Sequence, residues 1–220
     1  ADRLESRFQL AIDNNFKSIR DEPQFQKLIG RLTEKPTDRD AGWRADLAFL
    51  VSEAERMRPQ LDEDFPPEER SAMAADLYER IPQLSDAAIA IELQKFVSRF
   101  RDGHSHVRFY ESDRDLARLP LGFYWFSDGL FVIEAAEPYA SYVGWKVVQV
   151  GDLTVEELYE AVKQTTSRDN PTGIRSGGAW QITFPDVLAA IGCITDPGGA
   201  KFTLEAPDGT RERIRPKPGD

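Results

Sequence analysis

The stretch that decides the fold reads Phe123-Tyr124-Trp125-Phe126-Ser127-Asp128-Gly129-Leu130-Phe131-Val132-Ile133. Two runs of aromatic and β-branched residues flank an Asp-Gly step, a pattern typical of a β-hairpin with a tight turn. Similar short runs follow at residues 146–150, 201–205 and 211–214, with helical patterns at 155–163 and 184–191. The second half of the chain therefore predicts a small mixed α/β unit with an antiparallel sheet.

The first half of the chain has the texture of a helical protein. Apolar residues recur at helical spacing in four stretches, residues 1–32, 43–58, 68–81 and 86–100. Ser85 precedes the last stretch and is a plausible N-cap. Residues 62–67 are rich in acids and prolines and predict a loop. We expect helices before about residue 116 and a β-rich unit after it, which makes the protein α+β.

Composition excludes several classes of function. The chain has 220 residues and a formal net charge of −10, so no basic surface is expected to bind nucleic acid. Its one cysteine, Cys193, excludes an intramolecular disulfide and a thiolate metal cage. No apolar run approaches the roughly 20 residues of a membrane span, and residues 1–15 lack the apolar core of a signal peptide. We predict no cofactor.

The most specific motif is Phe100-Arg101-Asp102-Gly103-His104-Ser105-His106-Val107. With Trp43-x-x-Asp46-Leu47 and Pro82-x-Leu84-Ser85-Asp86, it resembles the helical N-terminal region of peptidase family S41, the C-terminal processing (tail-specific) and tricorn-like peptidases. The family signature is Asp-Gly-His-(Thr/Ser)-x-(aliphatic). This resemblance implies a helical bundle with the motif at its end.

A second resemblance concerns the part that follows. The carboxylate-binding loop of PDZ domains is similar to Leu119-Pro120-Leu121-Gly122-Phe123. Residues 128–132 resemble the hairpin that follows this loop, and residues 143–152 resemble the strand and turn that precede a PDZ helix. The two resemblances cover residues 43–215 in the family's order. They imply an N-terminal extension (1–42), a helical region of S41 type (43–112) and a PDZ-like domain (113–220).

The resemblance also implies what is missing. S41 peptidases carry the nucleophilic serine in a third domain after the PDZ-like unit, and this chain ends at Asp220, where that domain would begin. Either the chain has been cut before that domain, or the protein is a naturally serine-less relative. The linker-like ending at residues 216–220 favours the cut. We predict the substrate-recognition portion of a periplasmic or secreted serine peptidase, inactive by itself. The alternative is a non-catalytic peptide-binding or scaffolding module of PDZ-like type. The expected partners are peptide or protein C-terminal segments and the missing serine domain.

His104 is the candidate catalytic residue. An imidazole with a near-neutral pKa can accept a proton from a serine hydroxyl and return it to a leaving amine. The resemblance adds that the tricorn-like branch takes its catalytic histidine from this position, whereas another branch uses a lysine. The structural alternative is a helix C-terminus with Gly103 in a left-handed conformation and His104 complementing the helix dipole. We expect His104 to be exposed at a helix end, facing the side where the chain leaves near Asp220.

Three further candidates were weighed. A zinc site on His104 and His106 is not predicted, because neither a third histidine nor a nearby thiolate exists. Ser105 is rejected as a nucleophile, because the chain has no Gly-x-Ser-x-Gly elbow. Leu121, Gly122 and Phe123 are the candidate peptide-binding residues, whose backbone N–H groups would meet a peptide carboxylate. The alternative is that Gly122 marks a bulge and its neighbours are core.

Overall fold

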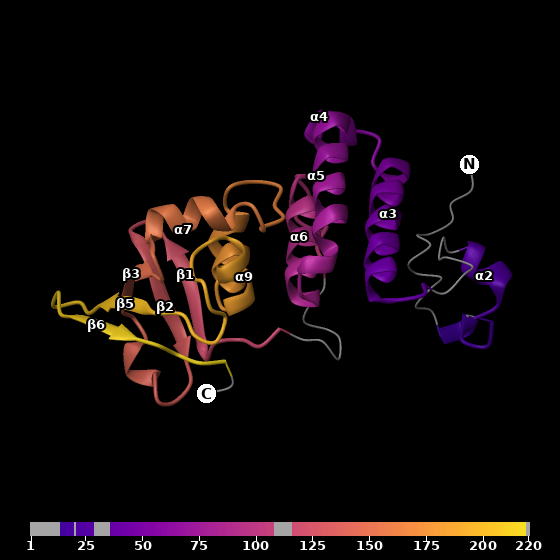
Figure 1. Cartoon of the computed structure of the whole chain (residues 1–220). Coiled ribbons are helices and arrows are strands. Elements are labelled where there is room, and N and C mark those ends of the chain that lie inside the picture. Colours follow the sequence, from indigo (N-terminus) through magenta and orange to yellow (C-terminus); the bar gives the residue numbers. More distant parts are fainter. Residues whose placement is uncertain (1–13, 20, 29–35, 108–115, 219–220) are drawn as a thin grey trace.

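The computed structural model describes residues 14–19, 21–28, 36–107 and 116–218 (Figure 1). Within these ranges the chain forms eight α-helices and a six-stranded sheet with antiparallel pairing throughout, so the predicted α+β class is confirmed. Helices α3 (Arg39–Met57), α5 (Pro67–Arg80) and α6 (Asp86–Ser98) stand side by side, and the sheet lies on the far side of α6 from α3 (Figure 1). None of the described helices is both long and apolar enough to cross a bilayer.

The helical part follows the predicted order. Its elements are a short 3-10 turn η1 (Asn14–Phe16), α2 (Pro23–Leu28), α3 (Arg39–Met57), α4 (Leu61–Asp64), α5 (Pro67–Arg80), the 3-10 turn η2 (Ile81–Gln83) and α6 (Asp86–Ser98). Ser85 caps α6 by accepting a hydrogen bond from the backbone N–H of Ala88, as predicted. The loop expected at residues 62–67 is wrong in part, because α4 reaches into it. Leu61 is buried and anchors that short helix to the core.

Apolar side chains from α3, α5 and α6 meet in two adjoining clusters. One gathers around Phe96, which is fully buried and meets Phe65 and Phe100 edge to face, with ring centroids 5.0 and 5.9 Å away. The second cluster consists of Leu47, Leu77, Ile81, Ile89 and Leu93. Removing a buried aromatic ring of this kind typically costs about 3–5 kcal/mol, so these helices are held together mainly by packing.

The sheet begins with the predicted hairpin. Strands β1 (Leu121–Phe126) and β2 (Gly129–Ala135) pair so that Phe126 faces Gly129, which leaves Ser127 and Asp128 as a two-residue turn. The remaining strands are β3 (Lys146–Val150), β4 (Leu153–Thr154), β5 (Phe202–Glu205) and β6 (Arg211–Ile214). The order across the sheet is β1-β2-β3-β5-β6, with β4 paired to β3. The predicted hairpin near the C-terminus is confirmed as β5 and β6.

Helices cover one face of the sheet. The cover consists of α7 (Val155–Val162), a π-helical turn η4 (Ile174–Gly178), α8 (Ala179–Gln181) and α9 (Pro185–Ala190). The helices expected at 155–163 and 184–191 are confirmed with slightly shorter bounds, whereas η4 and α8 were not expected. Alternate residues of β1 point into this core, where Phe123 stacks on Phe202 with 5.3 Å between ring centroids.

Helix α6 joins the two parts of the structure. Its Ile91 is buried with Phe184 and Val187 of the α9 region, which lies between α6 and the sheet (Figure 1). Its Gln94 side chain is 1% exposed and donates to the Thr165 carbonyl (2.8 Å), while its amide oxygen accepts from the backbone N–H of Val107 (2.7 Å). The predicted boundary between residues 112 and 113 lies outside the described residues, so the division into domains stays a prediction.

We predict that Gln94→Leu destabilises the protein by about 1–3 kcal/mol, because it leaves the Val107 N–H without its partner in a partly buried position. The free energy of unfolding is measured by urea denaturation. Gln83→Leu is the matched control, because Gln83 is exposed in η2. It should change stability by less than about 0.5 kcal/mol. Equal stabilities for the two variants would show that the Gln94 hydrogen bonds contribute nothing.

Candidate functional site

The backbone that carries His104 turns before it reaches the motif glycine. Helix α6 ends at Ser98, and Arg101 has a φ of 50°, the left-handed conformation that the sequence assigned to Gly103. That expectation for Gly103 is wrong, since its φ is not among the positive values of the described backbone. His104 therefore lies beyond the last turn of α6, too far along the chain to complement its dipole.

Gly103 is required for a different reason. Its N–H donates to Oδ1 of Asp169 at 2.9 Å, and a Cβ at this position would lie 2.7 Å from the other oxygen of the same carboxylate. Asp169 belongs to the loop between α7 and η4. The glycine thus permits a close approach between the motif and the sheet-containing part. This contact could not be predicted from the sequence, because the two residues are 66 positions apart.

The carboxylate of Asp102 organises the turn. Its Oδ2 accepts from the Ser105 hydroxyl (2.5 Å) and from Nη1 of Arg58 (2.9 Å), and its Oδ1 accepts from the backbone N–H of His104 (3.0 Å). Arg58 also donates to the Phe100 carbonyl at 2.8 Å and lies over the Phe100 ring. Arg58 follows α3 directly, so this residue, which sequence reasoning missed, ties the end of one helix to the exit of another.

These hydrogen bonds change the acidity of Asp102. Burial raises its pKa, but the hydrogen bonds from Ser105, from the His104 N–H and from Arg58 outweigh burial and lower the pKa to about 2. The carboxylate is therefore ionised at every pH near neutrality. It gives the turn a fixed negative charge beside the histidine.

His104 presents its ring to solvent. Its side chain is 94% exposed, and its Nδ1 lies 3.5 Å from Oδ1 of Asp102. The expected exposure of His104 is therefore observed. Whether His104 faces the side where the chain leaves stays a prediction, because Asp220 lies outside the described residues. Ser105 turns inward, and its hydroxyl donates a hydrogen bond to Asp102. Val107 packs against the two helical clusters. The alternation expected for residues 104–107 thus holds, with His106 exposed like His104.

One group of side chains has the composition of a cation site. Asp102, His104 and Asp169 place one ligand atom each within 4.8 Å of one another, whereas His106, the histidine considered as its zinc partner, is not in this group. An imidazole and two carboxylates suit a divalent cation. However, both oxygens of Asp102 already accept hydrogen bonds, one of them from a guanidinium. The Asp102 carboxylate is therefore already engaged by donors of the protein itself.

The candidate peptide-binding residues lie in a separate place, on β1. The side chains of Leu121 and Phe123 are buried in the sheet core, so only their backbone can meet a ligand. Gly122 lies at a β-bulge opposite Glu134, where a Cβ would come within 3.0 Å of the Glu134 Cβ. β1 is an edge strand, and its partner in the described residues is β2 alone. The bulge and the edge position of β1 are compatible with a peptide-binding loop and equally with a structural bulge whose neighbours are core.

We predict that Asp102→Asn lowers stability at pH 7 by on the order of 1–2 kcal/mol. The pKa of Asp102 is depressed in the folded protein, so the stabilisation is complete above about pH 4 and is lost as the pH falls towards about 2. Urea denaturation at several pH values measures the difference between the variant and the unmodified chain. It should shrink across this acidic window.

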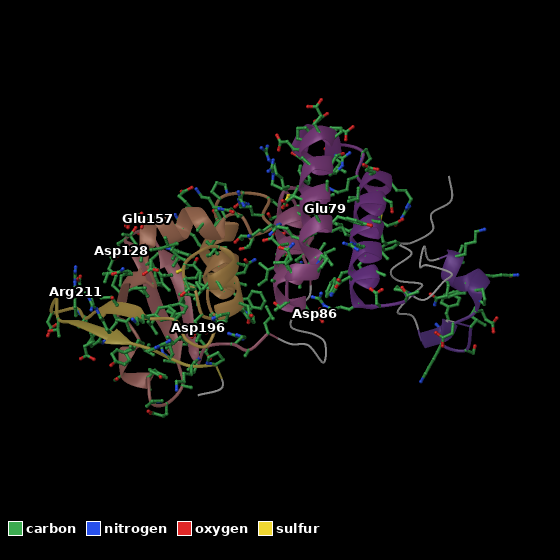
Figure 2. The ribbon with its side chains drawn as sticks, viewed as in Figure 1. Glu79, Asp86, Asp128, Glu157, Asp196 and Arg211 are labelled. Atoms are coloured by element: carbon green, nitrogen blue, oxygen red, sulfur yellow. The ribbon has the colours of Figure 1, made fainter. Side chains whose placement is uncertain are left out.

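Asp128→Asn is the control for this measurement. Asp128 is exposed in the β1–β2 turn, and Figure 2 shows it on the side of the sheet-containing part that is remote from α3, α5 and α6. Its substitution should leave the unfolding free energy unchanged at every pH. A difference between Asp102→Asn and the unmodified chain that does not depend on pH would contradict the assignment.

Comparison with known proteins gives a likeness of fold. The chain matches no protein-family model and no curated protein. Among solved structures, the chlamydial protein CPAF in its mature form with lactacystin is similar, with a TM-score of 0.51 and 15% identity over 81% of this chain and 34% of that one. A CPAF point mutant and mature CPAF alone, at 15% and 14% identity over the same shares, give TM-scores of 0.47 and 0.45. The chain thus spans about a third of the length of these structures, and it shares its fold with that part of mature CPAF.

Proposed function

We propose that this chain is the N-terminal, substrate-recognition portion of a serine peptidase of the S41 kind. In this proposal His104 accepts the proton of a serine that lies in a separate domain, and the chain has no activity by itself. The observation that carries the proposal is the exposed imidazole of His104 beside the ionised carboxylate of Asp102. A histidine base and an orienting carboxylate are two of the three groups of a catalytic triad, and the third is the serine nucleophile.

The surroundings of His104 support this role. A base that serves another domain must be open to that domain, and the His104 side chain is 94% exposed. Its turn is nevertheless fixed from two directions, through Arg58 on one side and Asp169 on the other. A fixed turn with an open ring suits a group that must meet a docking nucleophile in one geometry.

The likeness to CPAF adds support from the fold. CPAF is a serine protease, and the similar region is a minor part of its chain. A corresponding larger parent would provide room for a serine domain. The assignments to family S41, to a PDZ-like domain and to a periplasmic or secreted location belong to this same proposal.

The test uses a fluorophosphonate probe, which labels activated serines, together with a fluorogenic peptide. The 220-residue chain should give neither label nor turnover. In the longer parent protein, His104→Ala should lower kcat by about 10³-fold or more, because a triad member is lost. His106→Ala, two positions along the same exposed segment, is the matched control and should stay within a few-fold of the parent. Full turnover by the His104→Ala variant would contradict the proposal. So would peptide turnover by the 220-residue chain alone, if the Ser105→Ala substitution abolished it.

A second candidate function is a non-catalytic peptide-binding module, and the position of β1 at the edge of the sheet favours it. Tyr124 and Phe126 point to the uncovered face of the sheet, and Phe126 is 49% exposed. The Phe126 ring meets that of Phe131 on β2 at 5.7 Å. An extended peptide can add to such an edge through main-chain hydrogen bonds while its side chains rest on the aromatic rings.

This candidate predicts binding that depends on the peptide's C-terminal carboxylate. Fluorescence anisotropy with a labelled apolar peptide should show binding at least about 10-fold tighter for the free acid than for the C-terminal amide, a difference of about 1.4 kcal/mol. Phe126→Ser should weaken binding of the free acid, whereas Phe49→Ser, at an exposed position of α3, should not. Equal affinities for acid and amide would exclude a carboxylate-binding loop.

A further inference from the structure

We infer that Asp102 is the positioning residue of the His104 site. Its carboxylate holds the neutral imidazole with the proton on Nδ1 and leaves Nε2 facing outward as the proton acceptor. That Nε2 accepts the proton of a serine rests on the proposed function. The arrangement itself is a property of these 220 residues and is tested on them alone.

The geometry of the turn supports this role. Oδ1 of Asp102 accepts the backbone N–H of His104 at 3.0 Å and lies 3.5 Å from Nδ1 of the same residue. The two nitrogens of an imidazole point to opposite sides of the ring, so Nε2 is directed away from the carboxylate. A separation of 3.5 Å is longer than a good hydrogen bond. Catalytic hydrogen bonds of this kind are often long before a partner covers the site and shorten when it does.

The carboxylate is fixed well enough to act on the ring. Its Oδ2 is engaged by Arg58 and by the Ser105 hydroxyl, which leaves Oδ1 turned towards His104. Arg58 is itself held by the Phe100 carbonyl and by the Phe100 ring. Rotation of the Asp102 side chain would break these contacts. The ring therefore meets an oxygen in a defined place, although the ring itself is exposed.

Asp169 is the competing carboxylate, because it also has an oxygen within the 4.8 Å group around His104. Its Oδ1 accepts from the Gly103 N–H, and it reaches the turn from the sheet-containing part. Arg58, the cation at this turn, contacts Oδ2 of Asp102. The contact with His104 Nδ1 recorded in the structure comes from Asp102. The experiment must still separate the two carboxylates.

The consequence for proton transfer follows from the tautomer. With the proton on Nδ1, the lone pair of Nε2 takes the proton of a hydroxyl group, and the O–H electron pair stays on the attacking oxygen. The resulting imidazolium carries a proton on each nitrogen, and the Asp102 carboxylate balances its positive charge. With the proton on Nε2 instead, the outward nitrogen could not accept one. Asp102 thus acts through His104 and does not touch the substrate.

The test is ¹⁵N NMR of the imidazole nitrogens in the intact chain, which contains two histidines. Spectra are recorded at about pH 8.5, where an ordinary imidazole is neutral. His104 should show predominantly the Nδ1–H tautomer. His106 is outside the carboxylate group and serves as the internal control, with predominantly the Nε2–H tautomer that an unconstrained histidine favours. A His104 pattern equal to that of His106 in the unmodified chain would overturn the inference before any variant is made.

Asp102→Asn provides the second arm. Arg58 and Ser105 both donate to Oδ2, so they should keep the amide oxygen of the new side chain there and leave its NH₂ group in the place of Oδ1. The His104 backbone N–H then loses its acceptor, and Nδ1 of His104 faces a donor. The His104 tautomer should reverse to Nε2–H, and the backbone amide signals should change only at the turn around His104, while the His106 signals stay as they are. Asp169→Asn should leave the His104 tautomer as it is. Reversal by Asp169→Asn and not by Asp102→Asn would assign the role to Asp169 and sink the proposal.

The outcome is independent of the test of the proposed function. If the tautomer is as expected and His104→Ala leaves the longer protein active, Asp102 positions a histidine that has no catalytic role, and the proposed function fails. If His104→Ala abolishes turnover and the tautomer is not as expected, the proposed function stands and another group orients the base.

Discussion

Helix α6 is buried on opposite sides, and the rest of the structure depends on that position. One side packs on α3 and α5 through residues such as Phe96, and the other packs on the α9 region through Ile91. A helix that packs on two sides carries apolar residues on more than one face, and the buried residues of α6 include Ile89, Ile91, Leu93, Phe96 and Val97. Its single buried amide, Gln94, must satisfy both its donor and its acceptor there, and it does so with Thr165 and Val107. The helical part and the sheet-containing part therefore meet at α6, and the segment that carries His104 follows this helix.

The sequence predicted those features whose causes are local. Ser85 caps α6 because its hydroxyl reaches a backbone N–H three residues away, and such a bond needs nothing from the rest of the chain. The hairpin after Phe126 follows from the alternation on either side of the Asp-Gly step, although its two turn residues are Ser127 and Asp128 and Gly129 takes the first position of β2. The exposure of His104 was also expected, although the reason for its fixed position was not.

Features with distant causes could not be predicted. The sequence placed the left-handed residue at Gly103, the best local candidate, yet Arg101 adopts that conformation and Gly103 is instead needed for the approach of Asp169. Arg58 gave no sign of its contact with Asp102, because a guanidinium before a proline is ordinary at the end of a helix. The π-helical turn η4 was missed because Gly177 and Gly178 argue against a helix, and its packing against α7 and β1 outweighs that preference. The three-residue helix α8 continues directly from it.

The turn around His104 is held by contacts between residues far apart in sequence. The Arg58–Asp102 contact spans 44 positions and the Gly103–Asp169 contact spans 66. Closing long loops costs conformational entropy before any contact repays it, so such contacts form after the local helices and hairpins. During folding, the turn can take its final shape only once α3, α6 and the loop after α7 are in place. A half-folded chain would therefore not display the histidine in its final geometry, so the shape of this turn reports on the completion of the fold.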